Sequence, residues 1–199
     1  MDAALKRICV FCGANTGGRP AYALAARELA SLMARQRTGL VYGGGNVGLM
    51  GILADTMLEA GGEVIGVIPA SLVAREVAHS GLTELRVVQT MHERKALMNE
   101  LSDAFIAMPG GFGTLDELFE ILTWSQLGIH GKPSGLLNVA GYYDDLLVML
   151  DHAVTEKLLR PEHRTLLMAE ADPGLLLQRL GAFKPVTASK WADESGNFQ

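Results

Sequence analysis

The sequence predicts one three-layer α/β domain built on a mainly parallel sheet of about seven strands. Short segments that are apolar throughout recur along the chain, which is typical of strands buried on both faces of a sheet. Longer segments with helical periodicity separate these runs, as right-handed crossover connections require. Glycine-rich turns follow several of the apolar runs and punctuate the alternation.

The expected elements follow from these patterns in chain order. Pro20 favours a helix start because proline suits the first helical turn, and Gly61-Gly62 favours a helix end. Pro69 and Pro109 each close an apolar run. We expect strands at 7–12, 39–42, 63–68, 85–89, 104–108, 134–139 and 165–168. We expect helices at 20–36, 49–60, 91–101, 114–127, 143–156 and 173–180.

Length and composition agree with a single globular unit. The 199 residues can bury one sizeable core, and 49% of them are hydrophobic. No repeat or linker divides the chain, so we expect one nucleotide-binding domain over 1–182 and a polar C-terminal tail over 183–199. The net charge is −5 and no Lys/Arg block stands out, which argues against nucleic acid as the partner.

No apolar run is long enough to cross a membrane, and the first residues lack a signal-peptide pattern. We therefore expect a cytoplasmic protein that does not contact a membrane. Cys9 and Cys12 form a C-x-x-C, but residues three apart on a strand point to opposite faces. We interpret them as buried core cysteines, and the five histidines show no metal-ligand spacing, so no metal site is expected.

Three glycine-rich segments each follow a predicted strand, at 13–18, 43–48 and 110–113. In a parallel sheet, the loops at the carboxyl ends of the strands form the ligand crevice. Backbone N–H groups and helix N-termini in such loops bind anions without a Walker lysine. The segment 43–48 is a weak signal alone; Gly44 and Gly45 fit a tight turn about as well as a phosphate or nucleotide loop.

The segment 110–120 combines this glycine loop with carboxylates. Thr114 and Glu117 fit a capping box, with Thr114 as N-cap and Glu117 at the third helical position. From spacing alone, Glu117 is as well explained by capping as by catalysis. Gly110, Gly111 and Gly113 exceed what one turn requires, which favours a ligand.

Residues 91–100 place Arg94 and Lys95 near the start of another helix, after a strand. Cations are disfavoured there by the helix dipole, by a few tenths to about 1 kcal/mol. A solvated face paired with Glu93 or Glu100 is one explanation; contact with an anionic ligand is the one that we favour for Arg94.

These segments together resemble a known family. The run 109–117 is similar to the PGGxGTxxE signature of the LOG ("lonely guy") family, and 91–95 resembles the basic motif upstream of it. The segments 41–51 and 123–147 also look like family segments, in one register over about 6–180. Members are cytokinin riboside 5′-monophosphate phosphoribohydrolases with a Rossmann-like fold. Many relatives carry the label "lysine decarboxylase", for which we see no pyridoxal-phosphate lysine context.

The resemblance implies the site. Arg94 and Glu117 would form the catalytic pair, and no cofactor would be needed. The first loop departs from the family. Ala14 stands where members have a residue with a hydroxyl group, and the side chain of Asn15 or Thr16 could take over the contact of that hydroxyl. The resemblance also implies a homodimer or larger homo-oligomer. Substrate contacts would fall on Glu76, Arg94, Lys95, Gly111, Phe112, Gly113, Thr114, Leu115, Asp116, Glu117 and Thr123.

Two functions of different classes follow. The first is hydrolysis of the N-glycosidic bond of a nucleoside 5′-monophosphate such as N6-isopentenyl-AMP or AMP. The second is a nucleotide-binding or sensing module without turnover. The presence of both Arg94 and Glu117 favours the enzyme, because a binder would not need the carboxylate.

Overall fold

A computed structural model describes residues 5–73 and 78–185, and these residues form one seven-stranded sheet. Its strand order is β4-β3-β2-β1-β5-β6-β7, and every pairing is parallel. The parallel α/β prediction is therefore confirmed. The strands are β1 (Arg7–Phe11), β2 (Gly39–Tyr42), β3 (Val64–Pro69), β4 (Glu84–Val88), β5 (Ala104–Ala107), β6 (Ser134–Leu137) and β7 (Leu167–Glu170).

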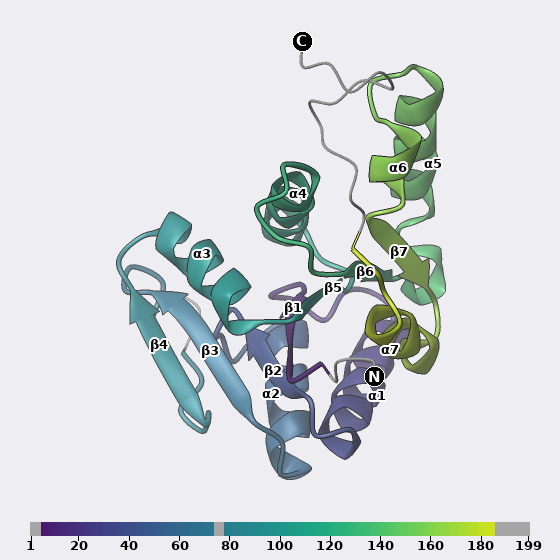
Figure 1. Ribbon diagram of the computed structural model, residues 1–199. Helices are drawn as coiled ribbons and strands as arrows, with labels where there is room; N and C mark the ends of the chain where they lie inside the picture. The colour runs from purple at the N-terminus through teal and green to yellow at the C-terminus, as the bar shows by residue number, and fades with distance from the viewer. Residues whose placement is uncertain (1–4, 74–77, 186–199) are drawn as a thin grey trace.

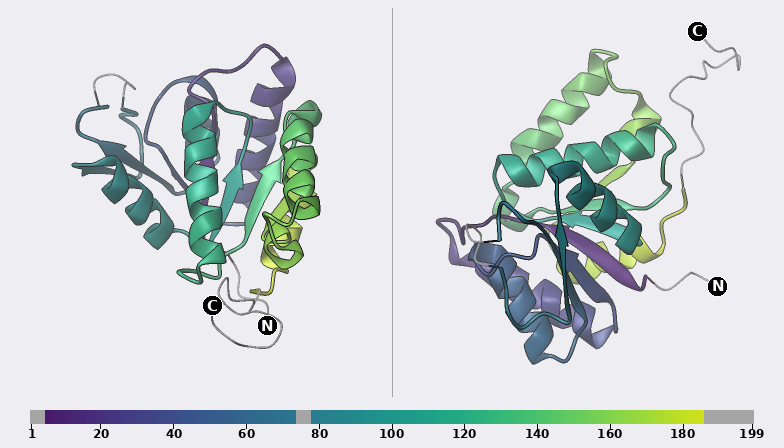
Figure 2. Two further views of the ribbon diagram at one scale, coloured as in Figure 1. Left: turned by 90° about the horizontal axis from the view of Figure 1, so that it is seen from above. Right: turned by 90° about the vertical axis from the view of Figure 1, so that its left-hand side faces the viewer.

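Helices cover both faces of the sheet (Figure 1). One face is covered by α1 (Pro20–Arg35), α2 (Gly48–Glu59) and α7 (Pro173–Gly181). The other is covered by α3 (Met91–Leu101), α4 (Phe112–Gln126) and α5 (Asp144–Thr155), with the short helix α6 (Pro161–Arg164) packed beside α5. Figure 2 shows the same arrangement from two further directions. No helix in the described part of the chain is long and apolar enough to cross a membrane.

Strand β1 shows how the sequence pattern builds the two cores. Ile8 and Val10 contribute to the core under α1 and α2, whereas Cys9 and Phe11 contribute to the core under α3 and α4. This alternation is the period of two that a strand imposes. Cys9 and Cys12 are both buried and free, and they belong to opposite cores, as the spacing predicted.

Several boundaries differ from those expected. Strand β7 begins at Leu167 rather than at 165, because residues just before it form the unexpected helix α6. The strand predicted over 134–139 stops at Leu137, and a 3₁₀ turn, η1 (Val139–Gly141), follows. Ala140 adopts a positive φ within that turn. Alanine rarely adopts this conformation, so nothing in the sequence indicated the turn.

The strand order places a topological switch point at β1. Chain connections lead from β1 to β2 on one side and return to β5 on the other. In open α/β sheets the ligand crevice lies at the carboxyl ends of such strands. The loops after β1, β2 and β5 are the three glycine-rich segments, so the fold brings all of them to one edge of the sheet.

Candidate active site

The three glycine-rich loops contact one another at the switch point. The backbone N–H of Gly13 donates to the carbonyl of Pro109 at 3.1 Å, and the N–H of Leu49 donates to the carbonyl of Gly13 at 3.0 Å. A side chain at Gly48 would collide with the backbone of Ala14. The loops are therefore held together by their own backbones, as a preformed ligand site requires.

A cleft of about 450 Å³ opens between the first and third loops. Tyr142 closes one side, and its hydroxyl donates to the carbonyl of Gly110 at 2.5 Å. Asn15 and Thr16 both line the cleft, so polar side chains beside Ala14 do face the third loop. The full lining is Asn15, Thr16, Gly17, Tyr22, Leu49, Pro109, Gly110, Gly111 and Tyr142.

Helix α4 begins two residues earlier than the sequence predicted. Gly111 is its N-cap, Phe112 is its first residue, and no side chain caps it. The capping box assigned to Thr114 and Glu117 is therefore wrong, because both residues lie inside the helix. A cap of this kind exists at α3 instead: Thr90 accepts a hydrogen bond from the Glu93 N–H, and Glu93 accepts one from the Gln89 N–H.

The glycines of the third loop differ in whether packing within the protein requires them. A side chain at Gly110 would collide with the hydroxyl of buried Thr114, so packing within the protein requires this glycine. A Cβ at Gly111 or Gly113 would meet no atom within 4 Å, and neither residue has a positive φ. Glycine suits the N-cap position of Gly111, but no close contact within residues 5–73 and 78–185 requires a glycine at either position. Open space beside the uncapped N-terminus of α4 is where an anion could approach the backbone closely.

Arg94 is a buried cation, only 6% exposed, at the fourth position of α3. Its Nε donates to the carbonyl of Val67 at 3.1 Å and its Nη2 to the carbonyl of Gly43 at 3.1 Å. The rigid guanidinium fork thus joins strand β3 to the loop after β2. A Cβ at Gly43 would collide with Nη2, so this glycine makes room for the arginine.

Glu117 faces the same point from α4. Its Oε1 lies 4.0 Å from Nη2 of Arg94, and its side chain is 13% exposed. The carboxylate also acts on the cysteine below it: burial first, and the charge of Glu117 second, raise the pKa of the Cys12 thiol. Arg94 and Glu117 therefore form a nearly buried pair of opposite charges above the carboxyl end of β1.

Lys95 joins α3 to α4 beside this pair. Its Nζ lies 3.2 Å from Asp116 Oδ2 and 2.9 Å from Glu120 Oε2. Burial acts to lower the pKa of Lys95, but hydrogen bonds to Glu120 and Asp116 outweigh burial and raise it. Lys95 and Asp116, both expected substrate contacts, thus pair with each other and hold the two helices in register.

The other expected site residues are distributed unevenly. Gly44 and Gly45 lie in the loop that Arg94 contacts, and Gly111, Gly113 and Thr114 form the start of α4. Phe112 is 94% exposed at the first position of α4, and Leu115 packs against the core below the helix. Glu76 lies outside the described residues.

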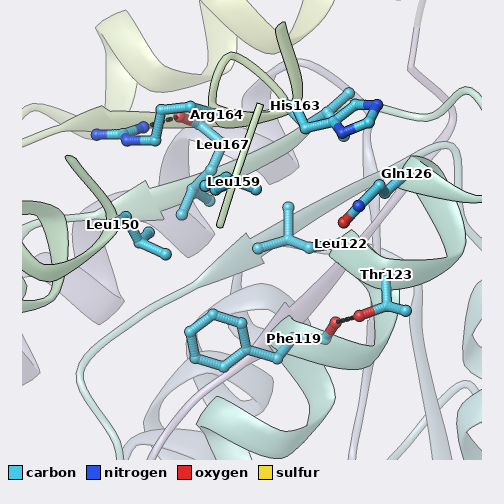
Figure 3. A pocket seen from close by; sticks show the side chains of 10 residues that line it. Phe119, Leu122, Thr123, Gln126, Leu150, Leu159, His163, Arg164 and Leu167 are labelled. Atoms are coloured by element: carbon cyan, nitrogen blue, oxygen red, sulfur yellow. Dashed lines mark hydrogen bonds between the residues drawn. The ribbon is translucent and has the colours of Figure 1, made fainter. Parts of the chain in front are cut away.

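Thr123 lies apart from the Arg94–Glu117 pair. It borders a second cavity, of about 430 Å³, between α4 and the α5–α6 region (Figure 3). Its hydroxyl donates to the carbonyl of Phe119 at 2.7 Å. Leu122, Leu159 and Leu167 supply apolar walls of that cavity. One chain therefore does not bring Thr123 together with the rest of the expected site.

Sequence reasoning missed two aromatic residues of the cleft, Tyr22 and Tyr142. Their rings meet edge to face at 5.8 Å, and they approach from α1 and from the turn after β6. Tyr142 falls in the segment 123–147 that resembles the family, but no pattern marks it as a site residue or joins it to Tyr22, which is far away in the chain. Among the described residues, no group of three or more His, Cys, Asp or Glu side chains could hold a metal ion.

Comparisons with known proteins show the family to which the chain belongs. Residues 50–180 match a family model described as "Possible lysine decarboxylase". The chain is 47% identical over 194 residues to a cytokinin riboside 5′-monophosphate phosphoribohydrolase of Arabidopsis thaliana, covering 95% of this chain and 85% of that protein. It is 49% identical over 181 residues to a probable enzyme of the same name from Oryza sativa subsp. japonica, covering 91% and 80%.

Solved structures resemble the fold. A molybdenum cofactor binding protein from Rippkaea orientalis superposes with a TM-score of 0.68 at 24% identity, covering 88% of this chain and 95% of that one. The molybdenum cofactor carrier protein of Chlamydomonas reinhardtii gives 0.66 at 22% identity, covering 89% and 98%. At these identities the likeness concerns the fold alone.

Proposed function

Because the chain belongs to the LOG family, whose curated members are cytokinin riboside 5′-monophosphate phosphoribohydrolases, we propose that it is such an enzyme. It hydrolyses the N-glycosidic bond of a nucleoside 5′-monophosphate, such as N6-isopentenyl-AMP or AMP. The products are the free base and ribose 5-phosphate. The observation that carries the proposal is the nearly buried Arg94–Glu117 pair beside an uncapped, glycine-lined helix N-terminus.

The 5′-phosphate binds at the start of α4. The N-cap residue Gly111 has no side chain that could accept from the N–H groups of the first helical turn, and the helix dipole favours an anion there. Gly111 and Gly113 leave the backbone open to close approach. Asn15 and Thr16, across the cleft, supply the polar contacts that Ala14 cannot.

Glu117 acts at the other end of the ribose. Cleavage of a ribosyl C–N bond develops positive charge on the sugar, as in glycoside hydrolysis. A carboxylate beside C1′ stabilises that charge and accepts a proton from the attacking water. The water oxygen bonds to C1′ as the bond from C1′ to the base nitrogen breaks. The proton that Glu117 accepts from the water then passes to the departing base, directly or through solvent, which restores the carboxylate. No metal or redox cofactor enters these steps.

Arg94 acts together with Glu117. Its bonds to Gly43 and Val67 fix the guanidinium, which stands 4.0 Å from the carboxylate. The guanidinium thereby stands at a fixed place beside the carboxylate that stabilises the oxocarbenium ion. Lys95, through Asp116 and Glu120, keeps α4 against α3 and thereby maintains that distance.

The active unit is a homodimer formed through α4 and α5. Helix α5 has no buried residue, and it exposes Val148 and Met149 at 67% and 50%. Exposed apolar residues on neighbouring elements are typical of an interaction surface. Thr123 lies on this side of α4, so a second subunit would be needed to bring it to a substrate.

The function is tested with a panel of adenosine, AMP, ADP, ATP and N6-isopentenyl-AMP, with chromatographic detection of free base. We expect release of base from the monophosphates only, because the site holds a single phosphate. The rival function, a cytoplasmic nucleotide-binding module without turnover, would be supported by saturable AMP binding with no adenine released over hours.

A further inference from the structure

A histidine outside the expected site is tied to the loop that Arg94 contacts. His79 is 8% exposed, and its Nε2 lies 2.9 Å from Oδ1 of Asp55 on α2. Its Nδ1 accepts a hydrogen bond from the N–H of Gly81 at 3.0 Å. We call these two side chains the Asp55–His79 pair.

These partners fix the state of the ring. A backbone N–H can only donate, so Nδ1 of His79 must be an acceptor and carries no proton. The proton therefore sits on Nε2 and is donated to the Asp55 carboxylate. A neutral imidazole held at both nitrogens has one orientation, which is the arrangement that fixes histidines in catalytic and metal sites.

The backbone of His79 is hydrogen-bonded to the second glycine-rich loop, which follows β2. The N–H of His79 donates to the carbonyl of Gly44 at 3.0 Å, and the neighbouring Ala78 forms an antiparallel bridge with Gly45. Gly44 has a φ of +78°, and a side chain there would press on Ile68 and Leu85. Glycine adopts this φ without strain, and the hydrogen bond from His79 fixes where the carbonyl of Gly44 lies.

The same loop holds the arginine. The carbonyl of Gly43, the residue before Gly44, accepts the hydrogen bond from Nη2 of Arg94. That same Nη2 lies 4.0 Å from Oε1 of Glu117. A continuous chain of contacts therefore runs from α2 through Asp55, His79, Gly44 and Gly43 to the Arg94–Glu117 pair.

We propose that the Asp55–His79 pair is a positioning device that holds the carbonyl of Gly43, and through it Arg94, at the correct distance from Glu117. The proposal rests on the proposed hydrolysis. Neither member of the pair touches the substrate. Loss of the pair lets the loop shift and misplaces the guanidinium, and a misplacement of about 1 Å can cost roughly a hundredfold in rate.

The test compares His79→Ala, His79→Gln and Asp55→Ala with the parent enzyme on AMP. We expect kcat to fall by roughly ten- to a hundredfold in His79→Ala and Asp55→Ala, with KM changed less than about threefold. Glutamine places an N–H near the position of Nε2, so His79→Gln should recover most of the lost kcat. The double variant should lose no more than either single variant, because the two residues act as a unit.

His130 provides a matched control. Its Nδ1 also accepts from the N–H two residues on, that of Lys132, and its Nε2 contacts the carbonyl of Ile121, but no glycine loop of the site depends on it. His130→Ala should lower the melting temperature as His79→Ala does and leave kcat unchanged. Equal loss of kcat in both histidine variants, or unchanged kcat in a folded His79→Ala, would overturn the proposal.

A readout that needs no turnover separates this proposal from the proposed function. The buried Nε–H of Arg94 should give a slowly exchanging side-chain resonance in ¹⁵N NMR spectra. We expect His79→Ala to accelerate its exchange and His130→Ala to leave it unchanged. An unaltered Arg94 signal in His79→Ala would refute the coupling, whereas absence of hydrolysis in the parent would refute only the function.

Discussion

At the scale of single residues, Arg94 connects the parts of the site. Its guanidinium contacts the loop after β2 and strand β3, and it lies 4.0 Å from the carboxylate of Glu117. Its two carbonyl acceptors, Gly43 and Val67, require a planar fork, and a lysine ammonium cannot reach both. We expect Arg94→Lys to lower kcat/KM by roughly a hundredfold. Steady-state hydrolysis of AMP measures this effect.

Arg7 supplies the control for that substitution. It donates two hydrogen bonds to Glu63, at 2.8 and 2.9 Å, and it lies at the amino end of β1, away from the site at the carboxyl ends of the strands. Arg7→Lys should retain full activity. An Arg94→Lys enzyme as active as Arg7→Lys would show that the fork geometry is irrelevant to the reaction.

The two cysteines give a prediction that depends on burial. Burial raises the pKa of Cys9 and of Cys12, so both stay protonated in the native protein at about pH 8. We expect Ellman's reagent to label neither thiol until denaturant is added, and to label both afterwards. Rapid labelling of the native protein would place the cysteines outside the core.

The same shift has a consequence for stability. An unfolded thiol ionises near pH 8.5, whereas the folded thiols resist ionisation. The contribution of the protonated thiols to the free energy of unfolding is therefore fully present below about pH 8.5 and is lost as the pH rises above it. The free energy of unfolding should decline from about pH 8 upward, in part for this reason.

At the scale of elements, the glycines at the start of α4 allow the effect of packing to be distinguished from the effect of ligand binding. Gly113→Ala places a better helix former in an open position, so stability should be unchanged or rise by up to about 1 kcal/mol. Affinity for the monophosphate should nevertheless fall, because the Cβ blocks the approach to the backbone. Thermal melting and the KM for AMP measure the two effects.

Gly110→Ala is the opposite case at the same element. Its Cβ would collide with Thr114, so we expect a loss of about 1–3 kcal/mol in the free energy of unfolding. If Gly113→Ala left KM unchanged, no ligand would approach that backbone, and the phosphate would have to bind elsewhere.

At the scale of elements, the sequence predicted β2 and α3 with their observed bounds, because Gly39 and Met91 sit beside clear breaks in pattern. It misplaced the start of α4. Thr114 looked like an N-cap, but its side chain is buried against Gly110, a tertiary contact that spacing cannot reveal. The short helix α6 was missed because four residues hold no period.

The candidate site was predictable only in part. Local pattern favoured a ligand contact for Arg94 but left Glu117 open between capping and catalysis, and the family resemblance alone implied that the two form a pair. Tyr142 and the Asp55–His79 pair were not predictable, because their contacts join segments that are far apart in the chain. The separation of Thr123 from Glu117 also required the packing of α4 against α5.

For the whole molecule, we expect Val148→Glu on α5 to break the dimer. A charge at the centre of an apolar interface is costly to bury. The mass measured by light scattering after gel filtration should fall from twice 21.3 kDa to 21.3 kDa. Leu24→Glu, at a position on the outer side of α1 that is 65% exposed, is the control and should stay dimeric. A monomeric parent protein would contradict the dimer outright.

The account as a whole depends on one carboxylate. Glu117 lies inside α4, beyond its first turn, so Glu117→Gln removes the charge of the side chain while keeping its shape. The measurement is the rate of adenine release from AMP by this variant, with its melting temperature and its affinity for AMP determined in parallel. We predict a folded protein that still binds AMP and has lost most of its hydrolysis. A Glu117→Gln enzyme that releases adenine at the parent rate would contradict the account.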